Sequence, residues 1–282
     1  MKKFAWTVRI TVLVLLSWAL IFNKAVEVTP VSLSFAELPS EFSGYRIAHV
    51  SDLHNTEFGK ENKRLLKKLR EANPDIIAIT GDILDSRRTD TAVALAFLEE
   101  ALKIAPCYYV TGNHEGRIMA EYYDFKAEMK DLGVTVLENQ KIQLTKGDQS
   151  ITLMGIDDPN VCNDGIRGDP EAVAASRIQN LRSNEDGFTI LLSHRPDLFP
   201  AYVSGGADLV LSGHVHGGQF RIPFIGGLYA PSQGFFPEYD YGLFSDEGTL
   251  MYVSRGLGNS VFPIRFHNRP EVVVITMLPY IS

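Results

Sequence analysis

The chain has 282 residues, of which 45% are hydrophobic and 22% are charged, with a formal net charge of −7 and a pI near 5.5. This acidic balance lacks the basic footprint of a nucleic-acid-binding protein, so we expect no nucleic-acid partner. The two cysteines, Cys107 and Cys162, are too few for a disulfide framework and do not indicate a redox compartment. The length suffices for one large domain with its own core.

The N-terminus carries Lys2, Lys3 and Arg9 ahead of an apolar run over residues 10–22. A helix over this run rises about 20 Å, which is shorter than the roughly 30 Å hydrocarbon core of a bilayer. It spans the core only if it begins near Phe4, in which case the Arg9 side chain must extend its charged end toward the lipid headgroups. We favour an uncleaved anchor over a cleaved signal peptide, because no clear cleavage site follows, and over a buried helix. The charge order predicts a cytoplasmic N-terminus and an extracytoplasmic domain at the cell membrane.

The chain then divides into a membrane anchor or signal-like segment over residues 1–24, a linker with an edge strand over 25–43, and a folded domain over 44–282. In this domain, short apolar runs predict strands over residues 45–51, 75–80, 107–112, 134–138, 151–157, 188–194, 207–214, 250–254 and 271–277. Apolar residues at helical spacing predict helices over residues 60–72, 90–104, 116–132 and 170–181. This alternation favours an α/β sandwich with its site at the carboxyl ends of the strands.

Polar clusters follow five of the buried strands. In order they are Asp52-x-His54, Gly81-Asp82-x-x-Asp85, Gly112-Asn113-His114-Glu115, His194, and Gly213-His214-x-His216, which together hold five of the seven histidines. Carboxylates and imidazoles together suit a divalent transition metal, and this many candidates indicates two ions. Two ions about 3.5–4 Å apart can clamp the attacking and leaving oxygens of a phosphoryl displacement.

The order of these five motifs resembles the calcineurin-like metallophosphoesterase superfamily, over essentially the chain from Tyr45 onward. The strings GHVHGGQ, SRGLG, PIRF and NRPE are similar to those of its membrane-associated bacterial phosphodiesterase branch, which includes YkuE-like and YaeI-like proteins and UDP-2,3-diacylglucosamine hydrolases. The resemblance implies a metallophosphoesterase catalytic domain over residues 44–282, built as a two-sheet sandwich flanked by helices. It also implies in-line attack on phosphorus by a hydroxide that bridges two divalent ions (Mn²⁺, Zn²⁺, Fe²⁺ or Co²⁺).

Residue roles follow from the same resemblance. It implies that Asp52, His54 and His216 bind one ion, that Asn113, His194 and His214 bind the other, and that Asp82 bridges them. His114 would act as a catalytic residue that stabilises the transition state or protonates the leaving oxygen, and Asp85 would orient its ring. The alternatives are that His114 is a further metal ligand and that Asp85 is a helix cap or solvated loop residue. Superfamily members with a GDxxDRG string carry an arginine directly after the second aspartate, where this chain has Ser86, and this difference argues against a phosphate contact from Arg87 or Arg88.

Three further polar residues are given no part in the chemistry. His49 points away from the D-x-H face and is expected to be structural, Glu115 is expected to be a helix-start carboxylate favoured by the helix dipole, and His267 has no assigned role. Residues 220–244 hold eight aromatic residues with several glycines and prolines. This segment is either an apolar wall beside the site for a lipid-bearing or nucleotide substrate, or a bilayer-contacting surface, or a packed hairpin that covers the sheet.

We therefore predict a membrane-tethered, metal-dependent phosphodiesterase or pyrophosphatase acting on a lipid-linked or nucleotide-containing phosphate. Two other functions fit the same residues. One is a non-catalytic metal-containing module that binds a phospholipid or a partner, and the other is a phosphomonoesterase. A substrate panel separates these three hypotheses.

Overall fold

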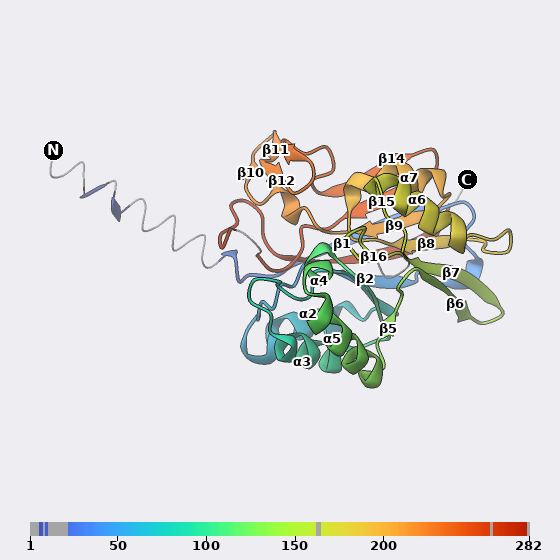
Figure 1. Ribbon diagram of the computed structural model, residues 1–282, viewed down its shortest axis with the longest axis horizontal. Coiled ribbons are helices and arrows are strands. Elements are labelled where there is room, and N and C mark those ends of the chain that lie inside the picture. Colours follow the sequence, from blue (N-terminus) through green and yellow to red (C-terminus); the bar gives the residue numbers. More distant parts are fainter. Residues whose placement is uncertain (1–5, 8, 11–21, 162–164, 260–261, 281–282) are drawn as a thin grey trace.

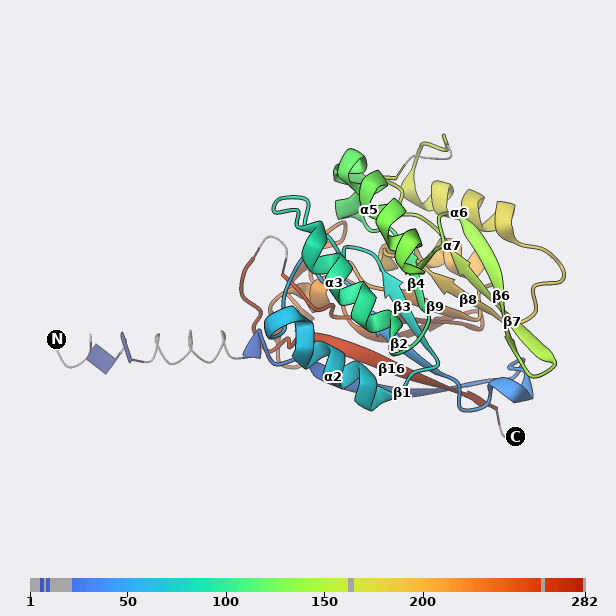
Figure 2. The same ribbon diagram turned by 90° about the horizontal axis from the view of Figure 1, so that it is seen from below.

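The computed structural model describes residues 6–7, 9–10, 22–161, 165–259 and 262–280. Within these residues, two six-stranded sheets pack face to face, and helices cover the outer face of each sheet (Figures 1 and 2). The α/β two-sheet sandwich flanked by helices that the sequence predicts is confirmed.

The first sheet combines strands from both ends of the chain in the order β1-β16-β2-β3-β4-β5. Its strands are β1 (Glu27–Phe35), β2 (Arg46–Val50), β3 (Ile76–Thr80), β4 (Cys107–Val110), β5 (Thr135–Val136) and β16 (Glu271–Pro279). β2 to β5 run parallel to one another, whereas β16 is antiparallel to β2. β1 pairs with β16 in parallel over nine residues, and it is the edge strand expected within residues 25–43.

The second sheet has the order β14-β15-β9-β8-β7-β6. Its strands are β6 (Gln140–Lys146), β7 (Gln149–Gly155), β8 (Thr189–Leu192), β9 (Leu209–Ser212), β14 (Gly242–Asp246) and β15 (Thr249–Val253). The four central strands are parallel, and an antiparallel strand closes each edge. In both sheets, therefore, the carboxyl ends of the central parallel strands share one edge, where a site can form.

The helices form the two outer layers. α2 (Lys63–Ala72), α3 (Thr91–Leu102), α4 (Asn113–Arg117) and α5 (Met119–Leu132) lie on the side of the first sheet, and α6 (Pro170–Leu181) and α7 (Phe199–Ser204) lie on the second. Single 3-10 turns are η1 (Ser40–Phe42), η2 (Lys60–Asn62), η3 (Pro196–Leu198) and η4 (His216–Gly218). Two small antiparallel hairpins, β10 (Arg221–Ile222) with β11 (Gly226–Gly227) and β12 (Tyr229–Ala230) with β13 (Gly234–Phe235), lie together at one end of the molecule (Figure 1).

Strand β3 shows why the central strands read as continuous apolar runs. Ile77 and Ile79 pack under the helices, whereas Ile76 and Ala78 pack between the two sheets. Successive side chains alternate between faces, and here both faces are buried. His49 lies on the inter-sheet side, where its Nε2 is 2.8 Å from Oγ1 of Thr80, as expected for a structural histidine.

The structure differs from the sequence prediction in several elements. The predicted helix over residues 116–132 is two helices, α4 and α5, because Ile118 leaves helical geometry at φ −127° and ψ 49°. The sequence analysis did not predict strand β6, which forms a hairpin with β7, or the short helix α7. The strand predicted over residues 134–138 is reduced to Thr135–Val136.

The N-terminal segment bears on the membrane prediction. Residues 1–5, 8 and 11–21 of the predicted anchor lie outside the described part of the chain. Among the described residues, none of the helices combines the length and the apolar character that crossing a bilayer requires.

Candidate metal centre

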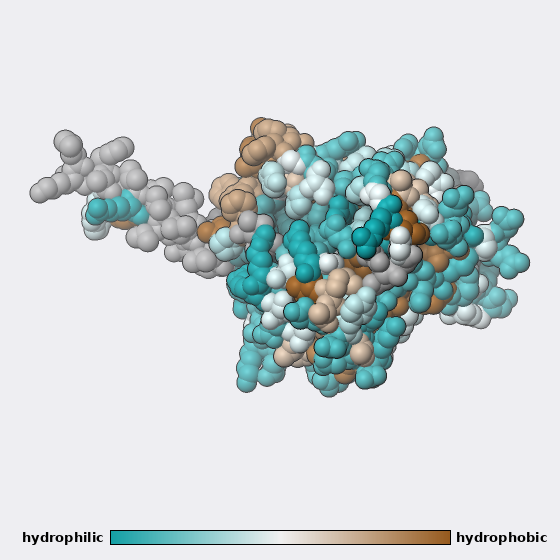
Figure 3. All heavy atoms as spheres, viewed as in Figure 1, coloured by the Kyte–Doolittle hydropathy of each residue, from teal (hydrophilic) through white to brown (hydrophobic). Residues whose placement is uncertain are grey.

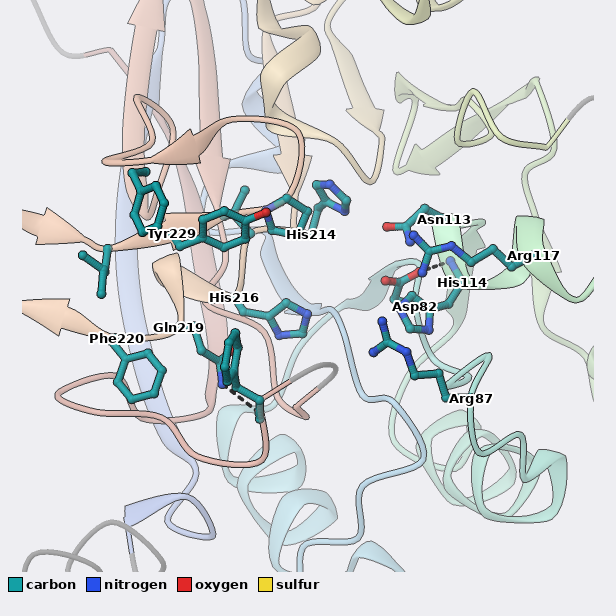
Figure 4. A pocket seen from close by; sticks show the side chains of 15 residues that line it. Asp82, Arg87, Asn113, His114, Arg117, His214, His216, Gln219, Phe220 and Tyr229 are labelled. Carbon is teal, nitrogen blue, oxygen red and sulfur yellow. Dashed lines mark hydrogen bonds between the residues drawn. The ribbon is translucent and has the colours of Figure 1, made fainter.

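The residues expected to form the site follow strands of both sheets and converge on one seam. Figure 4 labels Asp82, Asn113, His114, His214 and His216 among them. In chain order they are Asp52 and His54 after β2, Asp82 after β3, Asn113 and His114 after β4, His194 after β8, and His214 and His216 after β9. All eight side chains are buried. The structure therefore brings every predicted metal and catalytic histidine, together with Asp52, Asp82 and Asn113, into one place.

The backbone at this seam is unusual. Asp52, Asp82 and His214 have left-handed φ angles of 53°, 50° and 70°, a region that residues with a Cβ rarely occupy. Gly81 also has a positive φ, of 80°, and a Cβ there would lie 2.4 Å from the backbone nitrogen of Gly112. Such strained and closely approached loops cluster at functional sites, where the surrounding fold holds them.

The first donor group consists of Asp52, His54 and His216, whose ligand atoms lie within 4.8 Å of one another. Nε2 of His54 is 3.2 Å from Nε2 of His216 and 3.8 Å from Oδ1 of Asp52. Nε2 of His216 is 3.5 Å from the same carboxylate oxygen. The backbone N–H of His214 donates to both Asp52 oxygens, which fixes the carboxylate between the two sheets.

The second donor group consists of Asp82, His194 and His214, again within 4.8 Å. Nε2 of His194 is 3.3 Å from Oδ2 of Asp82 and 3.1 Å from Nδ1 of His214. The carboxamide of Asn113 lies 2.8 Å from Nδ1 of His214, next to this group.

Asp82 belongs to both groups. Its Oδ2 is 3.6 Å from Nε2 of His54 in the first group and 3.3 Å from Nε2 of His194 in the second. Its Oδ1 accepts the backbone N–H of His114 at 2.8 Å, which orients the carboxylate. One oxygen shared by two sets of nitrogen donors is the arrangement that a bridging carboxylate requires.

The carboxylates of Asp82 and Asp52 favour positive charge on His194. Burial disfavours the charged form of His194, but the Asp82 carboxylate outweighs it and raises the pKa of His194 to about 10. Nδ1 of His194 donates to the carbonyl oxygen of Thr80 at 2.7 Å, which leaves Nε2 as the nitrogen that takes a proton or a metal. The buried oxygen and imidazole donors therefore fit divalent transition-metal ions.

His114 is held differently. Its Nδ1 accepts the backbone N–H of Ser86 at 3.0 Å, whereas Oδ1 of Asp85 is 3.6 Å away, beyond hydrogen-bonding distance. Asp85 instead accepts the backbone N–H of Arg87 and pairs with the Arg88 side chain, so it shapes the turn that presents the Ser86 N–H. Because Nδ1 is an acceptor, the proton of the neutral ring lies on Nε2. Burial lowers the pKa of His114 to about 4, against the opposing pull of Asp82.

Glu115 has a role that sequence analysis missed. It was expected to be a helix-start carboxylate, and it does sit in the first turn of α4. Its fully buried carboxylate, however, accepts the backbone N–H groups of Asp82 at 2.9 Å, Leu84 at 3.0 Å and Gly112 at 2.8 Å. Glu115 therefore ties the loop after β3 to the loop after β4, and it fixes the backbone that carries Asp82.

Arg265 is a second missed residue, and the PIRF string contains it. Its buried guanidinium donates to the backbone oxygens of Arg255 and Gly258. Nη2 also lies 3.2 Å from Nδ1 of His216. Because Arg265 donates to Nδ1, the proton of the neutral His216 ring lies on Nε2, whereas in His194 it lies on Nδ1. A metal ion can bind Nε2 of His216 only after that proton has moved to Nδ1, so the contact with Arg265 would have to open.

Comparison with known proteins identifies the family. Residues 45–218 match the family model of calcineurin-like phosphoesterases, a span that contains every candidate site residue from Asp52 to His216. The chain belongs to this family. It is a metal-dependent phosphoric ester hydrolase.

Individual relatives agree with this assignment. The phosphoesterase is 31% identical over 260 residues to the uncharacterized metallophosphoesterase YkuE of Bacillus subtilis, covering 89% of this chain and 85% of that protein. It is 27% identical over 240 residues to the phosphodiesterase YaeI of Escherichia coli, covering 83% and 82%. Among solved structures, TT1561 of Thermus thermophilus superposes with a TM-score of 0.52 at 14% identity, over 76% of this chain and 91% of that one, which shows a shared fold.

A cavity of about 530 Å³ opens at the metal centre of the phosphoesterase. Its polar side is lined by Asp82, Asn113, His114, His214 and His216 together with Arg87 and Arg117 (Figure 4). Its opposite side is apolar and consists of Phe220, Leu228, Tyr229, Pro231, Phe235 and Phe262. The aromatic segment over residues 220–244 therefore has two parts. Its first part lines the cavity, whereas Tyr239 and Phe244 pack against the second sheet.

Proposed function

We propose that this phosphoesterase uses two divalent metal ions to hydrolyse a phosphodiester or pyrophosphate that carries a lipid or nucleotide group. The supporting observation is the two-sided cavity, in which the metal-donor residues face a wall of aromatic and aliphatic side chains. The donors suit the phosphate, and the apolar wall suits a large group esterified to it. A substrate without such a group would leave that wall in contact with water.

The proposed roles of the residues follow the two donor groups. Asp52, His54 and His216 hold one ion, Asn113, His194 and His214 hold the other, and Asp82 bridges them. When bound, the ions lower the pKa of water to supply the nucleophile and neutralise charge on the phosphate oxygens. Mn²⁺, Zn²⁺, Fe²⁺ and Co²⁺ are the candidates that accept this mixture of imidazole and carboxylate donors.

His114 is proposed to stabilise the transition state by donating a hydrogen bond from its Nε2–H group to the leaving oxygen. Its ring lines the cavity, and the Ser86 N–H at Nδ1 leaves the proton on Nε2. Asp85 supports this role through the turn that it stabilises rather than through direct contact with the ring.

The decisive experiment combines metal analysis with turnover. Protein loaded with excess Mn²⁺ and then desalted is expected to retain two metal atoms per chain and to hydrolyse a nitrophenyl phosphodiester, and chelation should abolish that activity reversibly. As a control, His267→Ala, which changes an exposed histidine outside the donor groups, should keep both atoms and full turnover. A metal content far below two in the wild type would overturn the binuclear proposal.

A substrate panel then addresses specificity. Lipid-linked, sugar-nucleotide and cyclic phosphodiesters should be compared with matched monoesters at equal concentration. We expect kcat/KM to be higher for diesters that carry a large apolar or nucleotide group. Equal or higher values for small monoesters would refute the diester proposal.

We also propose that residues 1–24 tether the enzyme to the cell membrane with its catalytic domain outside the cytoplasm. The support is the order of Lys2, Lys3 and Arg9 before the apolar run. Protease added to intact cells, with the outer barrier permeabilised where one exists, should then digest the domain. Survival of the domain, together with digestion of a known extracytoplasmic protein, would contradict this orientation.

A further inference from the structure

Apolar side chains project outward beside the mouth of the cavity. We use the term apolar rim for Ile222, Phe224, Ile225, Phe235, Phe236 and Phe262, all of which are exposed. Most of them belong to the β10–β11 and β12–β13 hairpins, and the brown and tan surface over β10 and β11 marks the hairpin part of the rim (Figure 3). Phe235 and Phe262 also line the cavity, so the rim is continuous with the apolar wall of the site.

Two aromatic residues of the rim have left-handed backbone conformations. Phe224 at the tip of the β10–β11 hairpin has a φ of 69°, and Phe236 after β13 has a φ of 54°. A left-handed conformation costs free energy for a residue with a bulky side chain. The side chain of Phe224 is fully exposed, at 109% of its reference area, so burial within this chain does not offset that cost. Outlying conformations of this kind are found where a residue is presented to a ligand or partner.

The rim is connected to the point at which the N-terminal apolar run joins the domain. The backbone of Phe220, at the base of the first hairpin, pairs with that of Phe266. A few residues further on, the guanidinium of Arg269 lies 5.6 Å from the ring centroid of Phe22. These contacts link Phe22, the last residue of the apolar run, to the base of the first hairpin through the segment from Phe266 to Arg269.

Positive charge flanks the same surface. Lys24 donates to the backbone oxygen of Glu57, and Arg269 donates to the backbone oxygen of Ala25. A backbone carbonyl satisfies a hydrogen bond without neutralising the charge of its donor. Two cations beside an apolar surface match the anionic headgroups and acyl chains of a lipid bilayer.

We propose that the apolar rim inserts into the interfacial layer of a lipid bilayer, with anionic headgroups at Lys24 and Arg269. The cavity mouth then lies at the membrane surface, and its apolar wall continues into the acyl region. A lipid-linked phosphate could pass from the bilayer to the metal centre without its chains crossing water. Insertion itself does not depend on the proposed function, whereas the route for a lipid substrate does.

The test of insertion uses the full chain, reconstituted into phosphatidylethanolamine–phosphatidylglycerol vesicles in which part of the lipid carries brominated acyl chains. Phe224→Trp adds a fluorophore at the rim, and Tyr280→Trp adds one at another exposed aromatic position, near the opposite terminus. Emission from the wild-type Trp6 and Trp18 is subtracted from both variants. Both substitutions replace exposed aromatic side chains and should leave the fold intact.

We expect bromolipids to quench the added emission of Phe224→Trp strongly and that of Tyr280→Trp little. Equal quenching at the two positions, or none at either, would overturn the proposal and favour a protein partner for the rim. Repeating the measurement with neutral lipid alone should weaken the quenching if Lys24 and Arg269 contribute, because surface attraction requires anionic headgroups.

A second arm tests the substrate route with Phe224→Ser and Phe236→Ser combined. We expect this variant to hydrolyse a soluble nitrophenyl phosphodiester at the wild-type rate, while hydrolysis of a long-chain phosphodiester embedded in vesicles falls by about tenfold because apolar contact drives interfacial binding. Unchanged vesicle activity would refute the route. If the wild type hydrolyses neither substrate, the proposed function fails, and the quenching experiment still decides whether the rim inserts.

Discussion

Replacing Glu115 with glutamine tests the inference that a buried carboxylate holds the metal-site backbone in place. In Glu115→Gln the side-chain volume is kept, but an NH₂ group must face at least one of the N–H donors of Asp82, Leu84 and Gly112. A buried N–H donor left without an acceptor destabilises a protein by about 2 kcal/mol. For a domain of this size that destabilisation lowers Tm by roughly 4–8 °C.

The same substitution should weaken metal binding. Asp82 is the shared carboxylate of the two donor groups, and a displaced backbone N–H at Asp82 moves its side chain. Loss of an outer partner of a metal ligand typically lowers metal affinity by about 10–100-fold. We expect competitive titration with a metal indicator to show a decrease of this size, accompanied by a fall in turnover at limiting metal that excess metal partly restores.

Glu138→Gln is the matched control. Glu138 accepts Tyr122 Oη and Lys126 Nζ, each at 2.9 Å, outside the donor groups. This control should change Tm modestly and leave metal affinity unaltered. The reasoning would be wrong if Glu115→Gln and Glu138→Gln bound metal equally well, or if Glu115→Gln melted at the wild-type temperature.

Further substitutions separate other parts of the site. His114→Asn should lower turnover by about 10²–10³-fold with two metal atoms retained, because the loss of one positioned hydrogen-bond donor to the transition state costs that much. Loss of one metal atom would instead make His114 a ligand. Gly81→Ala should destabilise the protein and lower its metal content, whereas Gly44→Ala, with a similar φ of 78° but no atom within 4 Å of its Cβ, should cost only about 1 kcal/mol by thermal melting. Arg87→Ala should raise KM for phosphate substrates because Arg87 lines the cavity, and Arg88→Ala, whose side chain pairs with Asp85, should raise it less; the opposite order would show that Arg87 does not meet the phosphate.

Part of the site could be predicted from the sequence because its residues directly follow apolar runs that form neighbouring parallel strands. Asp52, Asp82 and Asn113 each follow an apolar run, and parallel strands in one sheet bring their carboxyl ends together. His194 and His214 follow runs of the same kind in the second sheet. Their convergence with the first set depends on how two sheets face each other, which no short-range signal contains, so the ordered family motifs supplied that information.

The missed features depend on contacts that sequence spacing does not reveal. Glu115 is placed one residue after His114, as a helix-start carboxylate would be, yet its partners Asp82 and Leu84 lie more than thirty positions earlier in the chain. Arg265 approaches His216 from a segment without helix or strand periodicity. The break at Ile118 divides a stretch whose composition favours one continuous helix, since tertiary packing overrides local propensity.

Strand β16 has a consequence for how this protein is made. The last strand of the sequence lies inside the first sheet, between β1 and β2. Until the ribosome has released residues 271–279, both of those neighbours present open hydrogen-bonding edges, and nascent chains with such edges are prone to pair with one another. The sheet that carries Asp52 and Asp82 is therefore completed only after synthesis has passed Pro279, and cells that produce the protein in quantity should need a chaperone to keep the growing chains apart.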